Sequence, residues 1–195
     1  MNRLYLFSIV ACTVAFSMCL CGGCEESVKV AEKPERLLSA RFLDGQRAAQ
    51  QYAAGELADY EVVWKVYDLD AGEWQPFLDG FAEGLAGAGK QTQAATYRAV
   101  LQEAITGNQF QTAKDLGSKH AREAVTNEQI QGIIHSSLGV SRGVALGWKA
   151  GYIRGFAAQR VAERAATAFV DEKTIRGFHK EAAATYHALR AAIGQ

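Results

Sequence analysis

Apolar residues recur three and four positions apart along nearly all of the chain beyond residue 35, which is the spacing of a buried helix face. Alanine is abundant in these segments, and Pro34 and Pro76 are the two prolines of the sequence. The pattern predicts helices over residues 35–54, 57–67, 76–87, 92–106, 108–125 and 126–170, and a last helix from a cap at Asp171 to a point before Gly194. We therefore expect an all-α protein, a multi-helix bundle of about five to seven helices.

One of these segments, residues 57–67, fits two periodicities. Alternate positions from Tyr60 to Val66 are apolar, as in a strand, whereas apolar positions from Leu57 to Tyr67 also follow helical spacing. No second segment of this kind is present to pair with such a strand, and a lone strand leaves its backbone groups without hydrogen bonds. The helical interpretation is therefore preferred.

Glycine occupies every fourth position in one part of the longest predicted helix, residues 126–170. These glycines are Gly139, Gly143, Gly147, Gly151 and Gly155. Each costs a helix about 1 kcal/mol relative to alanine, so close packing has to compensate. Positions four apart lie on one helix face, where the missing side chains leave a groove for another backbone. We expect these five glycines to be helix-packing positions, within one bundle or between two copies of the chain.

The same glycine spacing also occurs where transmembrane helices meet. A second interpretation is therefore a membrane-active protein that inserts or oligomerises through residues 139–155. Arg142, Lys149 and Arg154 lie in this stretch, and each would cost roughly 2.5 to 3.5 kcal/mol near the centre of a bilayer. The charges favour packing within a bundle.

The first 24 residues differ in composition from the rest. Arg3 precedes an apolar run from Leu4 to Leu20, which ends in Cys21-Gly22-Gly23-Cys24. A basic start, a long apolar stretch and small residues before a cleavage point are the parts of a secretory signal peptide. The run has 17 residues, close to the shortest length that spans a bilayer, so a retained membrane helix is the alternative.

The ending of this leader resembles the lipobox of bacterial lipoproteins, in which the chain is cut before a cysteine that carries lipid. In that family Cys24 would be the acylated residue, with fatty acids such as palmitate. The sequence departs from the family pattern because Cys21 stands where leucine is usual and Leu20 lies one position further back. Glu25, rather than aspartate, follows the modified cysteine. The resemblance implies a lipid-anchored protein of the bacterial cell envelope, with the outer membrane favoured and a periplasmic or secreted form as the alternative.

The cysteines bear on the domain organisation. They are Cys12, Cys19, Cys21 and Cys24, all within the leader or at its edge. An exported domain without a cysteine pair has no intramolecular disulfides, so its core has to supply the stability. Removal of residues 1–23 leaves 172 residues, about one domain. We expect a signal peptide over residues 1–23, a tether over 24–35 and a single helical domain over 36–195.

Charge is balanced over the chain, with 21 basic and 21 acidic residues. Locally it is not, because residues 24–75 hold 11 acidic and 6 basic side chains, whereas residues 126–195 hold 5 acidic and 9 basic ones. No dense lysine and arginine cluster occurs, so the charge does not favour nucleic-acid binding. The expected partners are the membrane, through the N-terminal lipid, and an envelope protein or a second copy of the chain.

Catalytic and metal-binding patterns are weak. His120 and Glu123 lie one helical turn apart and His179 and His187 two turns apart, spacings that could bring metal ligands together. The chain has no HExxH motif and no P-loop. The expected function is a non-catalytic structural or interaction module without a cofactor, and an envelope hydrolase or metal-dependent enzyme is a further alternative.

One short repeat is present. Phe42-Leu43-Asp44-Gly45 recurs as Phe77-Leu78-Asp79-Gly80. The match stops after four residues and no third copy follows, so a solenoid of the tetratricopeptide kind is not expected.

Overall fold

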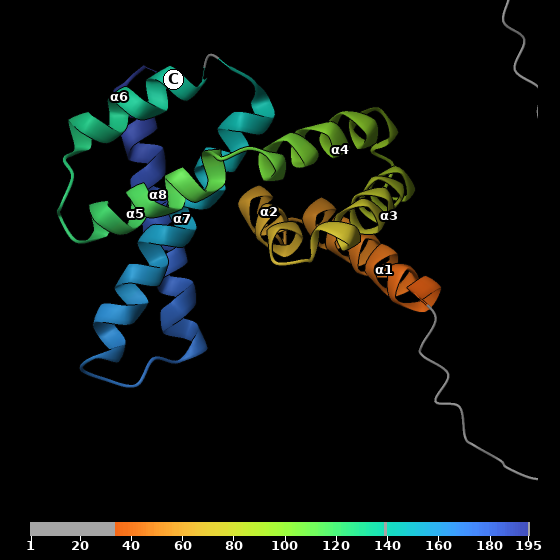
Figure 1. The fold of residues 1–195 in the computed structure, drawn as a ribbon, viewed down its shortest axis with the longest axis horizontal. Helices are drawn as coiled ribbons and strands as arrows, with labels where there is room; N and C mark the ends of the chain where they lie inside the picture. The colour runs from red at the N-terminus through yellow and green to blue at the C-terminus, as the bar shows by residue number, and fades with distance from the viewer. Residues whose placement is uncertain (1–33, 139, 195) are drawn as a thin grey trace, which may run out of the picture. The chain divides into compact units, whose positions relative to one another are not determined.

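A computed structural model describes the backbone of residues 34–138 and 140–194, and the side chains of residues 40–136 and 140–194. Over these residues the chain forms eight α-helices and one short 3₁₀ helix, and no strand (Figure 1). The helices are α1 (Pro34–Ala53), α2 (Asp59–Tyr67), α3 (Trp74–Gly87), α4 (Gln91–Thr106), α5 (Gln109–Ala121), α6 (Asn127–Leu138), α7 (Arg142–Ala165) and α8 (Glu172–Ala192). The all-α bundle is confirmed, with one helix more than expected. The leader, Cys24 and Gly139 lie outside the described residues.

The single long helix predicted over residues 126–170 was wrong, because this segment forms two helices, α6 and α7. Ser141 is the reason. Its backbone is extended, with φ −163° and ψ 167°, and its side-chain oxygen accepts a hydrogen bond from the backbone N–H of Val144 at 3.1 Å. A serine in this conformation caps the start of a new helix. The glycine series on α7 therefore begins at Gly143.

Other predicted helix starts are confirmed. The backbone N–H of Thr126 donates to the Gln129 side chain at 2.9 Å, as in a capping box. Asp171 accepts a hydrogen bond from the backbone N–H of Thr174 at 2.8 Å and so caps α8. The segment that fitted two periodicities is helical, as α2.

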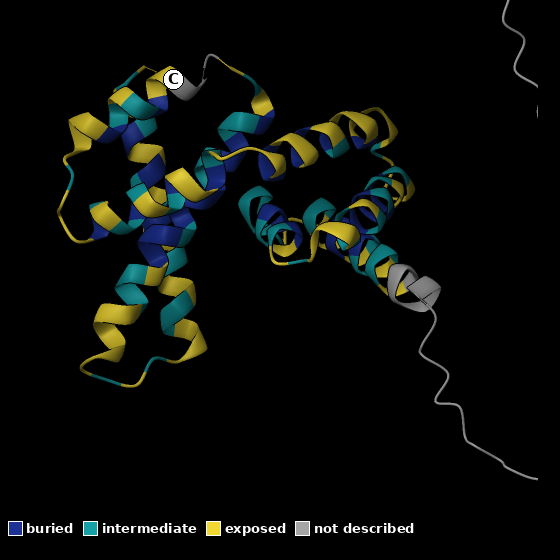
Figure 2. Cartoon of the chain, in the orientation of Figure 1, coloured by how far each residue is buried: buried dark blue, intermediate teal, exposed yellow. Residues whose placement is uncertain are grey.

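The buried hydrophobic residues form two clusters. Figure 2 marks the buried positions along the helices in dark blue. One is built mainly from α1 to α4 and also takes in Phe110, Leu146 and Ala150. The other is built from α5 to α8. Tyr60 and Trp64 of α2 are partly buried and pack against both clusters, and the indole N–H of Trp64 donates to the backbone oxygen of Ala150 at 2.8 Å. Helix α2 therefore joins the two cores.

Helices α5 and α7 cross with their backbones in contact. A Cβ atom added to Gly151 would overlap the carbonyl oxygen of Phe110, and one added to Gly155 would overlap that of Lys114. Helix α5 contributes the reciprocal contact, because a Cβ at Gly117 would overlap the carbonyl oxygen of Tyr152. Only glycine permits an approach this close.

The repeated tetrapeptide marks a second crossing of the same kind, between α1 and α3. A Cβ added to Gly45 would overlap the carbonyl oxygen of Phe77, and one added to Gly80 would overlap the carbonyl oxygen of Phe42. Each copy of the tetrapeptide thus supplies the glycine for the other copy's phenylalanine carbonyl. The repeat is a reciprocal packing device and not the beginning of a solenoid.

The last four helices repeat the contacts of the first four. Helix α1 packs against α3 and α3 against α4, while α2 contacts α3 and α4. In the same way α5 packs against α7 and α7 against α8, while α6 contacts α7 and α8. Helix α7 also packs against α2 and α4, so it joins the two sets.

The local hydrogen bonds repeat as well. After α1 the chain turns through Gly55 at φ 77°, and after α5 it turns through Glu123 at φ 59°. In each turn the next N–H reaches back five residues, from Glu56 to the Gln51 oxygen and from Ala124 to the Lys119 oxygen, both at 2.9 Å. These hydrogen bonds satisfy backbone carbonyl groups at the end of each helix. The same type of helix C-terminus therefore forms with glycine in the left-handed conformation after α1 and with glutamate after α5.

The hairpin of α7 and α8 is the largest difference between the two sets. These helices have 24 and 21 residues, against 14 and 16 in α3 and α4. The turn that joins them is exposed, as are the adjoining helix ends (Figure 2). Phe169 in this turn is 90% exposed.

The α5 and α7 crossing gives a stability prediction. Gly155→Ala should lower the free energy of unfolding by about 3 kcal/mol, because the new methyl group has to push a carbonyl of the neighbouring helix away. Gly177→Ala, on α8 with open space around the glycine, should instead raise it by about 0.5 to 1 kcal/mol. Urea unfolding of both variants measures the contrast, and equal effects at the two positions would contradict the packing assignment.

Candidate functional site

His120 is held by hydrogen bonds at both ring nitrogens. Its Nδ1 contacts the hydroxyl of Tyr152, and its Nε2 lies 3.0 Å from the side-chain oxygen of Asn127. A neutral ring that accepts from Tyr152 at Nδ1 and donates to Asn127 from Nε2 satisfies both contacts. Burial lowers the pKa of His120, which favours this neutral form. The histidine therefore pins α5 to α7 and to the start of α6.

The pairing of His120 with Glu123 is not formed as the spacing suggested. Helix α5 ends at Ala121, and Glu123 has left the helical conformation at φ 59°. Glu123 therefore does not continue the helix face that carries His120.

The two histidines of α8 contact different aromatic residues. His179 packs edge-on against the ring of Trp64, with ring centroids 4.9 Å apart, whereas the ring centroid of His187 lies 6.1 Å from that of its neighbour Tyr186. Across the part of the chain that the structure describes, no group of three or more histidine, cysteine, aspartate or glutamate side chains is placed to hold a metal ion.

A cleft of about 430 Å³ lies between the first four helices and the last four. Its polar and aromatic lining comes from five helices, with Tyr52, Asp59, Tyr97, Arg142, Lys149 and Arg190. The volume lies within the usual range for small-molecule sites. This cleft is the candidate functional site.

An ion pair forms one wall of the cleft. The ammonium group of Lys149 donates to both carboxylate oxygens of Asp59, at 2.9 and 3.2 Å. The Lys149 side chain is only 16% exposed, and its nitrogen also lies 5.6 Å from the centroid of the Tyr60 ring. Asp59 opens α2 and Lys149 lies in the middle of α7, so this pair fixes the two helices across the cleft.

Two polar groups in the cleft are buried without partners. Tyr97 is 6% exposed, and its hydroxyl oxygen has no hydrogen-bond partner within 3.5 Å among the described residues. The ring centroids of Tyr97 and Tyr52 lie 5.0 Å apart. Burial, with a smaller effect of Tyr52, raises the pKa of Tyr97, so its hydroxyl keeps its proton and can donate it. The Nε of Arg190 is likewise buried and unbonded within the described chain.

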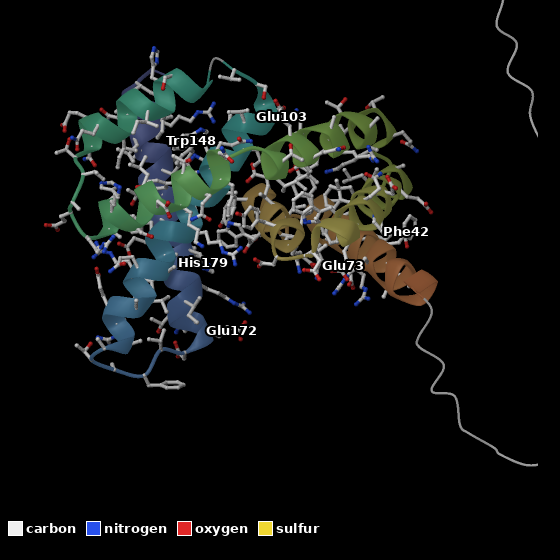
Figure 3. The ribbon with its side chains drawn as sticks, viewed as in Figure 1. Phe42, Glu73, Glu103, Trp148, Glu172 and His179 are labelled. Carbon is white, nitrogen blue, oxygen red and sulfur yellow. The ribbon has the colours of Figure 1, made fainter. Side chains whose placement is uncertain are left out.

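Arg142 completes the charged lining from the first turn of α7. The lining then holds three cations, Arg142, Lys149 and Arg190, against one carboxylate, Asp59. A second carboxylate, that of Glu103 on α4, lies beside the lining, because it accepts a hydrogen bond at 2.6 Å from the hydroxyl of Ser141, itself a lining residue (Figure 3). The cleft therefore presents a surplus of positive charge and unsatisfied donors.

This cleft was not predicted from the sequence. Its lining residues are spread from Tyr52 to Arg190, and all of them except Ser141 belong to helices whose apolar spacing is ordinary. A cluster of this kind is made by the crossing of helices and leaves no local motif.

Comparisons with protein-family models, with curated proteins and with solved structures found no match to this chain. None of the described helices combines the length and the apolar character that a membrane span requires.

The partial burial of His120 predicts that the free energy of unfolding depends on pH. Because its pKa is lower in the folded protein than the usual value of about 6.5, the unfolded chain takes up a proton first as the pH falls. The free energy of unfolding should decrease between about pH 7.5 and about pH 5.5. Burial lowers the pKa of His179 and His187 as well, so these residues add to the trend.

His120→Gln should reduce this loss of stability on acidification, and His135→Gln, at an exposed position of α6, should leave it unchanged. Thermal unfolding of the three proteins at both pH values provides the measurement. An identical pH dependence in His120→Gln and the parent protein would show that His120 is not the group responsible.

Proposed function

We propose that the protein is a lipid-anchored component of the bacterial cell envelope, whose helical domain acts as a non-catalytic interaction module. The observation that carries the proposal is the cysteine distribution. All four cysteines lie at or before position 24, and Cys24 directly follows two small residues at the end of the apolar leader. A cysteine kept at this place, with none beyond it, fits a lipid acceptor.

The start of the domain is compatible with such an anchor. Nine residues separate Cys24 from Pro34, where α1 begins. Fully extended, they would reach at most about 30 Å, so a domain of this size could stand clear of a membrane surface while remaining close to it.

The histidines support a non-catalytic role. Both ring nitrogens of His120 are used in hydrogen bonds between helices, and His179 packs edge-on against Trp64. These side chains join helices to one another and do not converge on a shared site.

The membrane-active alternative would require α7 to leave its neighbours. Gly151 and Gly155 lie against the backbone of α5, and a Cβ on Gly143 or Gly147 would contact α4. Insertion would break all of these contacts and would also expose Arg154, which is paired with Asp68 at 2.7 Å. We therefore prefer an interaction module to a pore-forming protein.

The lipid anchor gives a direct prediction. Protein isolated from its native envelope should have the mass of residues 24–195 plus acyl chains, and should enter the detergent phase of a Triton X-114 partition. Cys24→Ser should lose both properties, because serine offers no sulfur for acylation. Cys12→Ser, within the apolar run and away from the residues that resemble the lipobox, is the matched control and should keep them. An unmodified mass for the parent protein would exclude the anchor.

A further inference from the structure

We propose that the cleft between the first four helices and the last four binds a small organic anion, whose acidic group is held by Arg142, Arg190 and the hydroxyl of Tyr97. The proposal does not depend on the lipid anchor. It rests on the buried polar groups, the charge and the size of this cleft.

The buried polar groups indicate a missing partner. Polar atoms inside proteins are nearly always hydrogen-bonded, since an unsatisfied buried donor lowers stability. Tyr97 and Arg190 both break this rule, and both line the same cleft. A bound acceptor would satisfy the phenol hydroxyl and the guanidinium Nε together.

The charge indicates that this acceptor is an anion. Lys149 is neutralised by Asp59, but neither Arg142 nor Arg190 has a carboxylate partner in the part of the chain that the structure describes. Arg154, on the same helix as Arg142, is paired with Asp68. Two arginines without carboxylates at one cleft match a carboxylate or phosphate group, which guanidinium binds through paired N–H donors.

The walls indicate that the anion carries an apolar body. Tyr52 and Tyr97 form an aromatic surface with ring centroids 5.0 Å apart, and Val100 and Leu146 lie beside them. A volume of about 430 Å³ is more than an inorganic anion needs. The chemistry fits a compound with a ring or short hydrocarbon part and one acidic group, and it is shared by carboxylates and phosphate monoesters.

Calorimetric titration of the purified protein with benzoate and with phenyl phosphate tests the proposal and separates the two acidic groups. At least one of them should bind, and more tightly than inorganic phosphate or neutral benzyl alcohol. Stronger binding of benzoate would assign the site to carboxylates, and stronger binding of phenyl phosphate would assign it to phosphate esters. Absence of binding by both at millimolar concentration, or equal binding of benzyl alcohol, would overturn the proposal.

Two variants locate the site. Arg190→Gln should weaken binding of the better probe about tenfold or more, because a charged hydrogen bond is lost. Tyr97→Phe should weaken it about fivefold, yet leave the melting temperature of the free protein unchanged or higher, because it removes a buried hydroxyl that has no partner. Arg176→Gln, on α8 at the exposed pair with Glu172, is the matched control and should bind like the parent protein. Unchanged binding in both Arg190→Gln and Tyr97→Phe would place the anion elsewhere and refute the assignment.

Discussion

The close backbone contact between α5 and α7 is the constraint on which the rest of the fold depends. Gly151 and Gly155 lie against carbonyl oxygens of α5, and Gly117 returns the contact from the other side. One face of α7 packs in this crossing. On the same helix the side chains of Tyr152, Ile153 and Phe156 are also buried. Helix α7 thereby becomes the element that α2, α4, α6 and α8 all contact.

The position of α7 also determines the cleft. Trp64 donates to the backbone of α7 at Ala150, and Asp59 pairs with Lys149 one residue earlier on α7. These two contacts hold α2 against the middle of α7. Arg142 lies two turns nearer the start of that helix and lines the same cleft as Tyr97, so the positive lining of the cleft follows from the helix crossing and not from any local sequence pattern.

Much of the secondary structure could be predicted because its signals are local. The capping contacts of Thr126 and Asp171 and the apolar spacing of the helices depend only on neighbours in the chain. The break before α7 was missed because Ser141 is also compatible with a helix interior, and its capping role depends on the extended backbone that precedes α7.

The glycine spacing predicted that another helix backbone would lie close to α7, but it did not indicate which helix. The partner is α5, where Gly117 makes the reciprocal close contact with α7. This contact joins segments far apart in sequence, so no local pattern indicates it. From the sequence, the repeated tetrapeptide was judged not to indicate a solenoid, and no other role was assigned to it. Its two copies pair across α1 and α3, a contact that only the three-dimensional structure reveals. The cleft could not be predicted either, because an orphan hydroxyl such as that of Tyr97 is a property of the packed molecule.

The glycine crossings also change which conformational entropy is lost on folding. At these positions the loss falls on the backbone and not on side-chain rotamers. A leucine that packs between two helices loses rotamer freedom, about 0.5 to 1 kcal/mol, whereas a glycine has none to lose but gives up more backbone freedom than any other residue. Stiffening the unfolded chain by Gly→Ala is therefore open only where a methyl group finds space, at positions such as Gly132 on α6. At the crossings glycine cannot be replaced, so the unfolded chain keeps its extra backbone freedom there. The loss of that entropy on folding is therefore an unavoidable cost of this helix packing.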